Sequence, residues 1–324
     1  MEGGLTVDDR SHLNRVFLVA ADGERHLVVK VGAGVAREAA VIERLRPVAT
    51  LAHALPRVVD HDRAEQVLVL EAAPGARDLV RHHARGRFSR SLAAEAGRSL
   101  ACLHALPPAA LDGVAALLPA TPPHRPDLDG LRTLSGAAIE LTRIVQGSAE
   151  LCAELDELLA SPPPAVAVVH GDVRWGNCIA LRRGSRGWNG LQLVDWELCG
   201  AGDPAVDVGA FIGEYLRAWM GSMPVADPRD PGALRGRAQI PLRRLRPAVQ
   251  AFWTAYAGHR PDPPEASGET LRRSLRFAGV RLLVAALEGA QAAGELRPGI
   301  VALLPLSRNV LRRPDQAAAL LELA

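Results

Sequence analysis

Three oxygen-bearing side chains follow apolar segments in the middle of the chain. Asp172 comes after the apolar run 166–169 and a His-Gly turn, and Asp195 comes directly after the run 191–194. Asn177 lies between them, five residues after Asp172. A strand that ends in a polar turn places such side chains at the edge of a core, where substrate can reach them. One carboxylate base and two oxygen ligands for a hard cation are what phosphoryl transfer to a hydroxyl group requires.

The segments on either side of Arg186 are expected to pair as an antiparallel hairpin. Asn177 lies nine positions before Arg186 and Asp195 nine positions after it, so the ladder would place the two side by side. We therefore expect both to bind Mg²⁺, which takes its other ligands from water and substrate phosphates. Asp172 is expected to accept the proton of an attacking hydroxyl, and Arg174 to steady the transferring phosphoryl oxygens.

Lys30 is the only lysine of the chain, since every other basic side chain besides histidine is an arginine. It stands near the end of the second of two apolar runs that Asp22-Gly23 joins into a predicted hairpin. The periodicity predicts a helix over 36–45, and Glu38 lies on its apolar face. A carboxylate that faces a core needs a cation, so we expect an ion pair with Lys30. The alternative is that Glu38 only favours the helix dipole.

The order of the predicted elements indicates an α+β chain with two lobes. The first lobe, residues 1–72, contains mainly antiparallel strands and one helix, and a hinge follows at Ala72–Gly75. The second, residues 73–324, is mainly helical, with three short strands around Asp172 and Asp195. A chain of 324 residues is long enough to give both lobes a core.

The composition excludes several classes of protein. A formal net charge of +2 gives no general argument for nucleic acid or membrane as a partner. The four cysteines are scattered, which favours reduced thiols in the cytoplasm over disulfides or zinc. Residues 1–4 lack the pattern of a signal peptide, and the most apolar stretch, 277–287, is interrupted by Arg281 and too short to span a bilayer.

The segments His170–Asn177 and Asp195–Glu197 resemble the signature of the aminoglycoside phosphotransferase and choline kinase families. These families share a bilobal protein-kinase-like fold, and the resemblance extends over most of the chain. It implies ATP and Mg²⁺ as cofactors, with Asp172 as the catalytic base. It also implies that Asn177 and Asp195 are the metal ligands and that Lys30 with Glu38 holds the phosphates.

The resemblance assigns further residues and shows two departures. Leu70 and Glu71 match the segment that lines the adenine pocket, and Asp207 matches the residue that braces the catalytic loop. No glycine-rich loop covers the phosphates, because Asp9–Leu13 stands where such a loop would lie. The N-terminus is also short for a complete first strand. These departures concern how the nucleotide is covered, not the fold.

Acceptors of these families include antibiotics, choline, sugars and amino-acid-like metabolites. The acceptor pocket is expected between the catalytic loop and the C-terminal helices, near Glu214, Tyr215, Trp219 and the loop 224–232. Tyr215 and Trp219 are four residues apart, so core packing is an equally good interpretation. The stretch 195–224 is also similar to lanthipeptide-like kinases, which phosphorylate Ser or Thr of a precursor peptide before dehydration and act beside a partner enzyme.

Two other functions fit parts of the pattern. A degenerate kinase fold that only binds nucleotide, or serves as a scaffold for a partner enzyme, would explain the missing glycine-rich loop, but it has no use for a positioned base. A cysteine hydrolase built on Cys178 and His170 lacks an orienting third group. His170 is therefore expected to support the site structurally.

Overall fold

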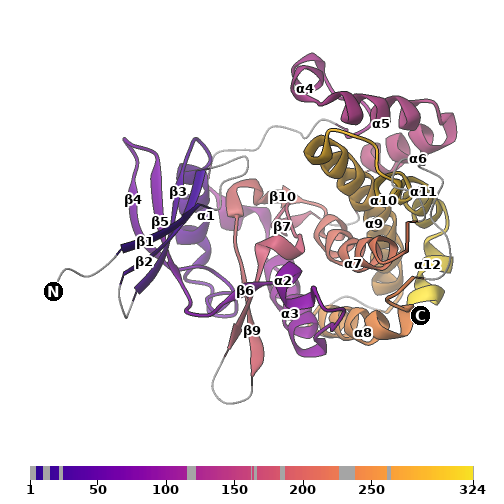
Figure 1. Ribbon diagram of the computed structural model, residues 1–324. Coiled ribbons are helices and arrows are strands. Elements are labelled where there is room, and N and C mark those ends of the chain that lie inside the picture. The colour runs from indigo at the N-terminus through magenta and orange to yellow at the C-terminus, as the bar shows by residue number, and fades with distance from the viewer. Residues whose placement is uncertain are drawn as a thin grey trace.

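The computed structural model describes residues 5–9, 15–21, 25–114, 122–161, 163, 166–182, 187–225, 238–260 and 264–323. Its N-terminal part is a five-stranded antiparallel sheet with the strand order β1-β2-β3-β5-β4 (Figure 1). The strands are β1 (Leu5–Asp9), β2 (Arg15–Ala21), β3 (Arg25–Val31), β4 (Val58–Asp62) and β5 (Val67–Ala72).

Strands β2 and β3 form the predicted hairpin, with Val16 opposite Lys30, although the turn at Asp22-Gly23 lies outside the described residues. Strand β1 corrects the expectation of an incomplete first strand, because it pairs with β2 along all of its residues. The described side chains of β1, from Thr6 to Asp9, are exposed. This edge strand is held by backbone hydrogen bonds to β2. Because these side chains are exposed, hydrophobic periodicity in the sequence does not predict the strand.

Helix α1 (Val35–Leu45) covers the sheet with the face that the periodicity predicts. Val41, Ile42 and Leu45 are fully buried on that face, and Glu38 is buried among them. Helix α1 also packs against the turn Trp196–Leu198, which follows Asp195. This contact joins the sheet to the residues expected to bind metal.

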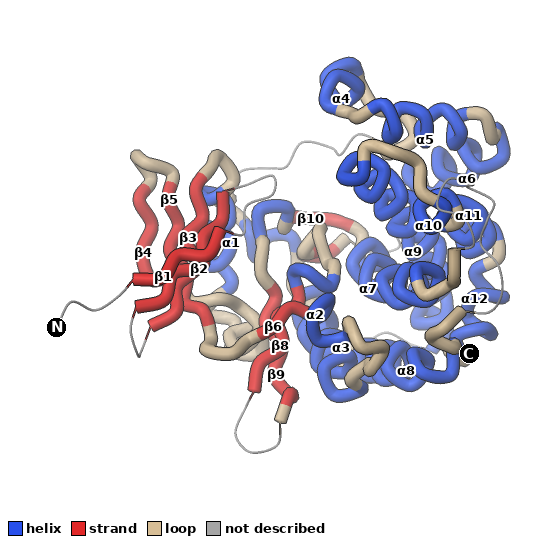
Figure 2. The backbone as a smooth tube through the Cα atoms, in the orientation of Figure 1, coloured by secondary structure: helices blue, strands red, loops and turns tan. Residues whose placement is uncertain are grey.

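The remainder of the chain is mainly helical, and Figure 2 shows the helices gathered on one side and the large sheet on the other. Its longer helices are α3 (Arg90–His104), α5 (Gly136–Gln146), α6 (Ala149–Ala160), α7 (Pro204–Gly221), α8 (Leu242–Gly258), α9 (Pro264–Ala293) and α11 (Leu303–Arg312). The shorter ones are α2 (Leu79–His83), α4 (Leu128–Thr133), α10 (Pro298–Val301) and α12 (Pro314–Leu321), with a 3₁₀ turn at Pro108–Leu111. Residues 261–263, just before α9, lie outside the described residues, as do 226–237 of the loop after α7.

Two small sheets lie between these helices and the large sheet. Strand β7 (Ala167–Val169) pairs with β10 (Gly200–Gly202), and β8 (Cys178–Arg182) pairs with both β6 (Arg77–Asp78) and β9 (Trp188–Leu193). They carry the 3₁₀ turns Trp175–Asn177 and Trp196–Leu198 and so position the candidate site. The predicted α+β class is confirmed. No helix in the described part of the chain combines the length and apolarity that crossing a bilayer requires.

Candidate active site

The segment after β7 brings Asp172 and Asn177 into direct contact. The amide nitrogen Nδ2 of Asn177 donates to the carboxylate Oδ2 of Asp172 at 2.7 Å and to its backbone oxygen at 3.0 Å. Both partners can only accept, so the amide nitrogen must face Asp172 and the amide oxygen Oδ1 must point the other way. Asn177 thus steadies the carboxylate with one end and offers a metal-type oxygen with the other.

The Asp172 carboxylate is held in a partly desolvated setting that makes it a better base. Burial raises its pKa, while the nearby charges of Arg174 and His170 oppose that rise and only partly cancel it. The Arg174 guanidinium lies 3.3 Å from Asp172 Oδ2 and 4.0 Å from Asp195 Oδ2. One arginine therefore lies between the two carboxylates, where transferring phosphoryl oxygens would need a positive charge.

Asp207 fixes the backbone from which Asp172 projects. Its two carboxylate oxygens accept from the backbone N–H groups of His170 at 2.6 Å and Gly171 at 2.9 Å, and Oδ2 also accepts from His104 Nε2 at 3.1 Å. Burial alone would raise the pKa of Asp207, but the hydrogen bond and charge of His104, together with His170, hold it below its ordinary value. This agrees with the bracing expected of Asp207.

His170 supports the same loop. Its Nδ1 accepts from the N–H of Asp172 at 3.3 Å, and its Nε2 lies 3.1 Å from the carbonyl oxygen of Val194, to which it donates. Contacts at both ring nitrogens fix the orientation of the ring. The ring links the segment before Asp172 to the strand end before Asp195, which is a structural task.

Gly171→Ala should lower the free energy of unfolding by about 1–2 kcal/mol or more, because Gly171 has a φ of +83° and an added Cβ would lie 2.5 Å from the carbonyl oxygen of Leu198. The loop that carries Asp172 would move with it, so kcat should also fall. Gly176→Ala is the matched control, since a Cβ there meets no atom within 4 Å. Equal urea-unfolding curves for the two variants would contradict the strain argument.

Lys30 lies on β3 opposite these groups and joins the two parts of the site. Its Nζ donates to Glu38 Oε1 at 2.9 Å and Oε2 at 2.7 Å, and to Asp195 Oδ1 at 2.9 Å. Burial opposes the charged ammonium, but the charges of Glu38 and Asp195 raise its pKa overall, so Lys30 stays charged at neutral pH. The predicted Lys30–Glu38 ion pair is confirmed, and the N–H of Trp196 also donates to Glu38, at 3.3 Å.

Asp195 takes an unusual backbone conformation. Its φ of 72° and ψ of 60° are left-handed, which costs energy for any residue other than glycine. This turn redirects the chain immediately after β9 and aims the carboxylate at Lys30. Strain held by surrounding contacts is typical of functional positions.

The predicted register between Asn177 and Asp195 is wrong by one residue. Strands β8 and β9 pair Cys178 with Leu193, and the N–H of Val194 donates to the carbonyl oxygen of Asn177 at 3.0 Å. Asn177 therefore lies opposite Val194, and Asp195 comes one residue beyond. An irregularity at Leu181 shifts the ladder, and the turn around Arg186 lies outside the described residues.

A second contact ties α1 to the segment after Asp195. The Arg37 guanidinium donates to the backbone oxygens of Glu197 and Cys199, with Nε 2.9 Å from the first of them. A Cβ at Gly34 would lie 2.1 Å from Glu197 Oε2, so the side chain of Glu197 passes directly over this glycine. Arg37 could not be predicted from the sequence, because its partners are backbone atoms and leave no side-chain pattern.

Three residues expected to bind the acceptor are buried or half-buried in the helical part instead of lining an open pocket. Tyr215 is fully buried, and its ring packs against Trp175, His83 and Phe88. Trp219 is half-buried and packs against the core, so the alternative interpretation of core packing describes this pair. Glu214 is buried as well. Because α7 packs along α9, its inner face cannot line an open pocket.

Glu214 belongs to a charged network that the sequence did not reveal. Its carboxylate accepts from Arg281 at 3.0 Å and Arg217 at 2.9 Å, and Arg281 also donates to both oxygens of Glu288, at 3.1 and 3.0 Å. Glu288 in turn lies 4.0 Å from Arg174. Helix α9 thus reaches the catalytic loop through Glu288. Arg281 and Glu288 are seven residues apart, which is about two turns of one helix. This spacing could have predicted their ion pair from the sequence.

Leu70 and Glu71 lie in β5, immediately before the predicted hinge. Leu70 is buried opposite Val28 of β3, whereas Glu71 is exposed and lies 3.5 Å from Arg57. Their part in binding adenine stays a prediction. The segment expected to replace a glycine-rich loop is described only at Asp9, because 10–14 lie outside the described residues.

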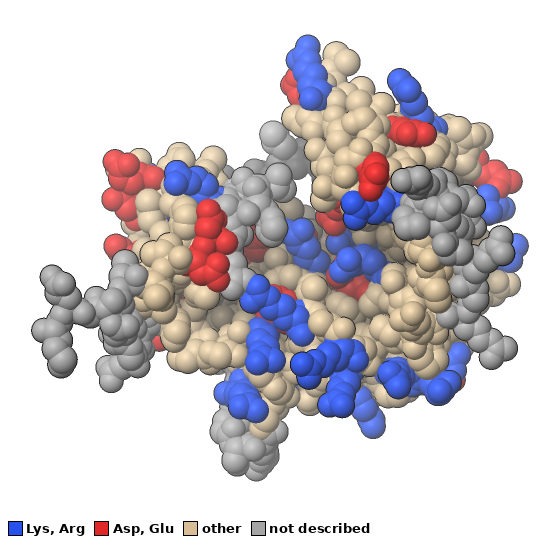
Figure 3. Space-filling view, viewed as in Figure 1, with Lys and Arg blue, Asp and Glu red and all other residues tan. Residues whose placement is uncertain are grey.

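The donor set fits Mg²⁺ rather than a softer metal. Among the described residues, no group of three or more His, Cys, Asp or Glu side chains could hold a metal alone. Asn177 Oδ1 and Asp195 Oδ2 supply two hard oxygens, and Mg²⁺ keeps waters and phosphate oxygens for its remaining positions. Figure 3 shows the surface hollowed between the sheet and the helices, with acidic and basic side chains in the hollow.

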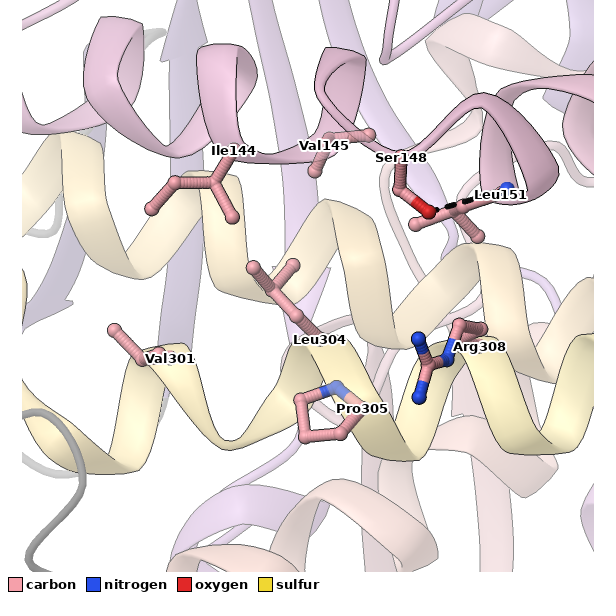
Figure 4. A pocket seen from close by; sticks show the side chains of 8 residues that line it. All are labelled: Ile144, Val145, Ser148, Leu151, Val301, Leu304, Pro305 and Arg308. Carbon is pink, nitrogen blue, oxygen red and sulfur yellow. Dashed lines mark hydrogen bonds between the residues drawn. The ribbon is translucent and has the colours of Figure 1, made fainter.

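A separate groove lies within the helical part. Figure 4 shows Ile144 and Val145 of α5 facing Leu304 and Pro305 of α11. Its lining is apolar apart from Ser148, which caps α6, and Arg308. It offers no base, nucleophile or metal ligand, so it is not part of the candidate active site.

Comparison with known proteins agrees with this geometry. The sequence model of a phosphotransferase enzyme family matches residues 5–252. No curated protein matches the sequence. A choline/ethanolamine kinase family protein from Mesorhizobium loti is similar in structure, with a TM-score of 0.56 and 18% identity over 98% of this chain and 93% of the other.

Two further solved structures have the same fold. An ethanolamine kinase from Plasmodium vivax gives a TM-score of 0.54 at 14% identity, covering 95% of this chain and 83% of that one. A choline kinase from Cryptosporidium parvum gives 0.54 at 12% identity, covering 98% and 90%. At these identities the structures show the fold alone. Since the family match spans most of the sequence, the chain belongs to the phosphotransferase enzyme family and is a kinase-type enzyme.

Proposed function

We propose that the protein uses Mg²⁺ and ATP to transfer the γ-phosphoryl group to a hydroxyl acceptor. The observation that carries this proposal is that Lys30 binds Asp195 across the two parts of the chain, with Arg174 between Asp195 and the Asp172–Asn177 pair. We place the division between these parts at the predicted boundary, 1–72 and 73–324. We also propose a cytoplasmic location, because all four cysteines are free thiols.

The proposed reaction is an in-line displacement. The acceptor oxygen attacks the γ-phosphorus, its proton passes to the Asp172 carboxylate, and the bond from the γ-phosphorus to the bridging oxygen breaks, so ADP leaves with that electron pair. Asn177 holds Asp172 in position, and Arg174 neutralises the phosphoryl oxygens. When bound at Asn177 and Asp195, Mg²⁺ would neutralise charge on the phosphates.

Lys30 is the proposed phosphate-binding cation. Its three donors are shared between Glu38 and Asp195, and among the described residues Lys30 is the one charged partner of Glu38. We propose that Glu38 keeps Lys30 in place while an ATP phosphate takes over the donor that Lys30 now gives to Asp195. Leu70 and Glu71 of β5 are the proposed contacts of the adenine.

The acceptor is proposed to be a hydroxyl-bearing small molecule or a Ser or Thr side chain of a peptide. The similar structures named choline/ethanolamine kinase and ethanolamine kinase support the first class. Arg174 lies 3.3 Å from Asp172 and 4.0 Å from Glu288, which pairs with Arg281, so an acceptor beside Asp172 would meet both signs of charge. Tyr215 and Trp219 are not part of this proposal.

Lys30→Met should weaken binding of Mg-ATP by about 10–100-fold, the loss expected when a charged hydrogen bond to phosphate is removed. Lys30→Arg is the matched control, because it keeps the positive charge but changes its shape. The guanidinium is broader than the ammonium and cannot occupy the same buried space. We expect it to restore stability better than nucleotide affinity. Isothermal titration with Mg-ATP checks both variants, and an unchanged Kd for Lys30→Met would show that another cation holds the phosphates.

A further inference from the structure

Exposed arginines gather on the surface beside the catalytic loop. They come from β6, from α2, from the turn that follows it, from the start of α3 and from the end of β8. We call this set the arginine surface: Arg77, Arg81, Arg85, Arg87, Arg90 and Arg182. Between residues 77 and 90 the sequence has five arginines and only one acidic residue, Asp78.

Most of this charge is not neutralised within the part of the chain that the structure describes. Arg81 lies 3.6 Å from Asp78, whose other carboxylate oxygen caps α2. The other members make no ion pair with any described residue. His82 adds no charge at neutral pH, because burial and the charge of Arg77 lower its pKa. The arginine surface therefore carries about four or five uncompensated positive charges at close spacing.

The arginines project from a rigid frame. Strand β6 pairs with β8, and the hydroxyl of Ser91 at the start of α3 donates to the backbone oxygen of Trp188 on β9 at 3.1 Å. The guanidinium groups of Arg77 and Arg182 lie over the ring of Trp188, at 5.6 and 5.2 Å from its centroid. Such preorganisation lowers the entropy lost when a ligand binds.

The positive region continues towards α8. Gly86, in the turn between α2 and α3, packs against Ile240, just before α8 begins. Arg243 and Arg244 in the first turn of α8 are exposed. Figure 3 shows Lys and Arg side chains spread over α2, α3 and α8, with few acidic side chains among them.

The arginine surface borders the proposed site of chemistry. Arg77 pairs with Ala180 of β8, and Asn177 lies three residues before Ala180. At about 3.3 Å per residue this is roughly 10 Å along the strand. His83 of α2 also packs on Trp175, with ring centroids 4.6 Å apart. A ligand on this surface could therefore extend to Asp172.

The chemistry of the surface selects a multivalent anion. Each guanidinium group can pair with one carboxylate through two parallel hydrogen bonds. A ligand that pairs with several arginines on different elements must therefore carry several anionic groups. Nucleic acid fits less well, because single strands need free aromatic faces for base stacking. Trp188 is already covered by Arg77 and Arg182 and contacted by His82. The ring of Phe88, in the turn before α3, packs against His83, Trp175 and Tyr215.

We propose that the arginine surface docks an acidic segment of a polypeptide next to the catalytic loop. The interaction is electrostatic and arises from exposed guanidinium groups on a fixed frame. It goes beyond phosphoryl transfer and does not depend on it, so its failure would leave the proposed function untouched.

The test uses the full chain and three fluorescent probes: a Glu- and Ser-rich peptide, the same peptide with Lys in place of Glu, and a single-stranded oligonucleotide of equal charge. The triple variant Arg85→Glu/Arg87→Glu/Arg90→Glu reverses exposed charges outside the proposed catalytic machinery. The matched control, Arg132→Glu/Arg143→Glu/Arg308→Glu, reverses three exposed charges on α4, α5 and α11. Urea unfolding checks that both variants are folded.

We expect the acidic peptide to bind the wild type, to bind the triple variant about tenfold more weakly or worse, and to bind the control as it binds the wild type. Affinity should fall with added salt, because the Debye length is about 10 Å at 0.1 M. Equal losses in both variants, or no binding of the acidic peptide, would overturn the proposal. Tighter binding of the oligonucleotide, lost in the same variant, would reassign the surface to nucleic acid.

Discussion

Asp172→Asn is expected to lower kcat for phosphate transfer by about 10²–10⁴-fold and to leave the Kd for Mg-ATP nearly unchanged. The amide keeps the size of the carboxylate and can still accept the hydrogen bond from Asn177. It cannot accept the proton of the acceptor hydroxyl. Single-turnover measurement of transfer, with nucleotide titration in parallel, separates loss of chemistry from loss of binding.

The pH dependence of the wild type gives an independent check on Asp172. Burial raises the pKa of this group above its ordinary value of 3.8, so the ionised base should be lost at a higher pH than for an exposed aspartate. We expect kcat/KM to fall on the acidic side with a midpoint above that value. Asp172→Asn should flatten this limb of the profile, and a profile that keeps it would assign the base to another group.

Asp207→Ala is expected to lower the free energy of unfolding by about 3–5 kcal/mol, the range for removing one partner of a buried charged network. The carboxylate is fully buried and accepts from His170, Gly171 and His104. Removing it leaves buried donors without an acceptor. Asp129→Ala is the matched control, because that side chain is 89% exposed and its loss should cost less than about 0.5 kcal/mol.

The contribution of Asp207 should also depend on pH. Its pKa is lower in the folded chain than in the unfolded chain, so ionisation stabilises the fold above the unfolded value of about 3.9. That stability is lost as the pH falls through the folded value. Urea unfolding of wild type and Asp207→Asn should therefore differ most near neutral pH and converge in acid. A difference that stays constant down to strong acid would show that Asp207 acts through packing alone.

Local pattern predicted the elements that carry the site. The β2–β3 hairpin, the inward-facing Glu38 on α1 and the strands around Asp172 and Asp195 are short-range features of the sequence. The pairing of Lys30 with Glu38 followed from a buried carboxylate that needed a cation, and the structure confirms it. Asp195 as a second partner of Lys30 joins residues 165 positions apart, which no local pattern contains.

Long-range packing determines the positions of the residues whose roles could not be predicted from the sequence. Tyr215 lies inside the protein because α7 packs along α9, whereas its spacing to Trp219 fitted either a core or a pocket. Arg281 and Glu288 reach the catalytic loop only because the fold lays α9 beside it. The shift of one residue between β8 and β9 depends on a strand irregularity that hydrophobic pattern does not specify.

The most direct measurement is transfer of a labelled γ-phosphoryl group from ATP to a panel of antibiotic, sugar, amino alcohol and Ser/Thr peptide acceptors. Wild type, Asp172→Asn and Asp195→Asn are compared, each with Mg²⁺ and with a chelator. The proposed function predicts label on at least one acceptor with wild type and Mg²⁺, and loss of that label in both variants and with the chelator. Wild type that binds Mg-ATP yet labels no acceptor, or equal labelling by Asp172→Asn, would contradict it.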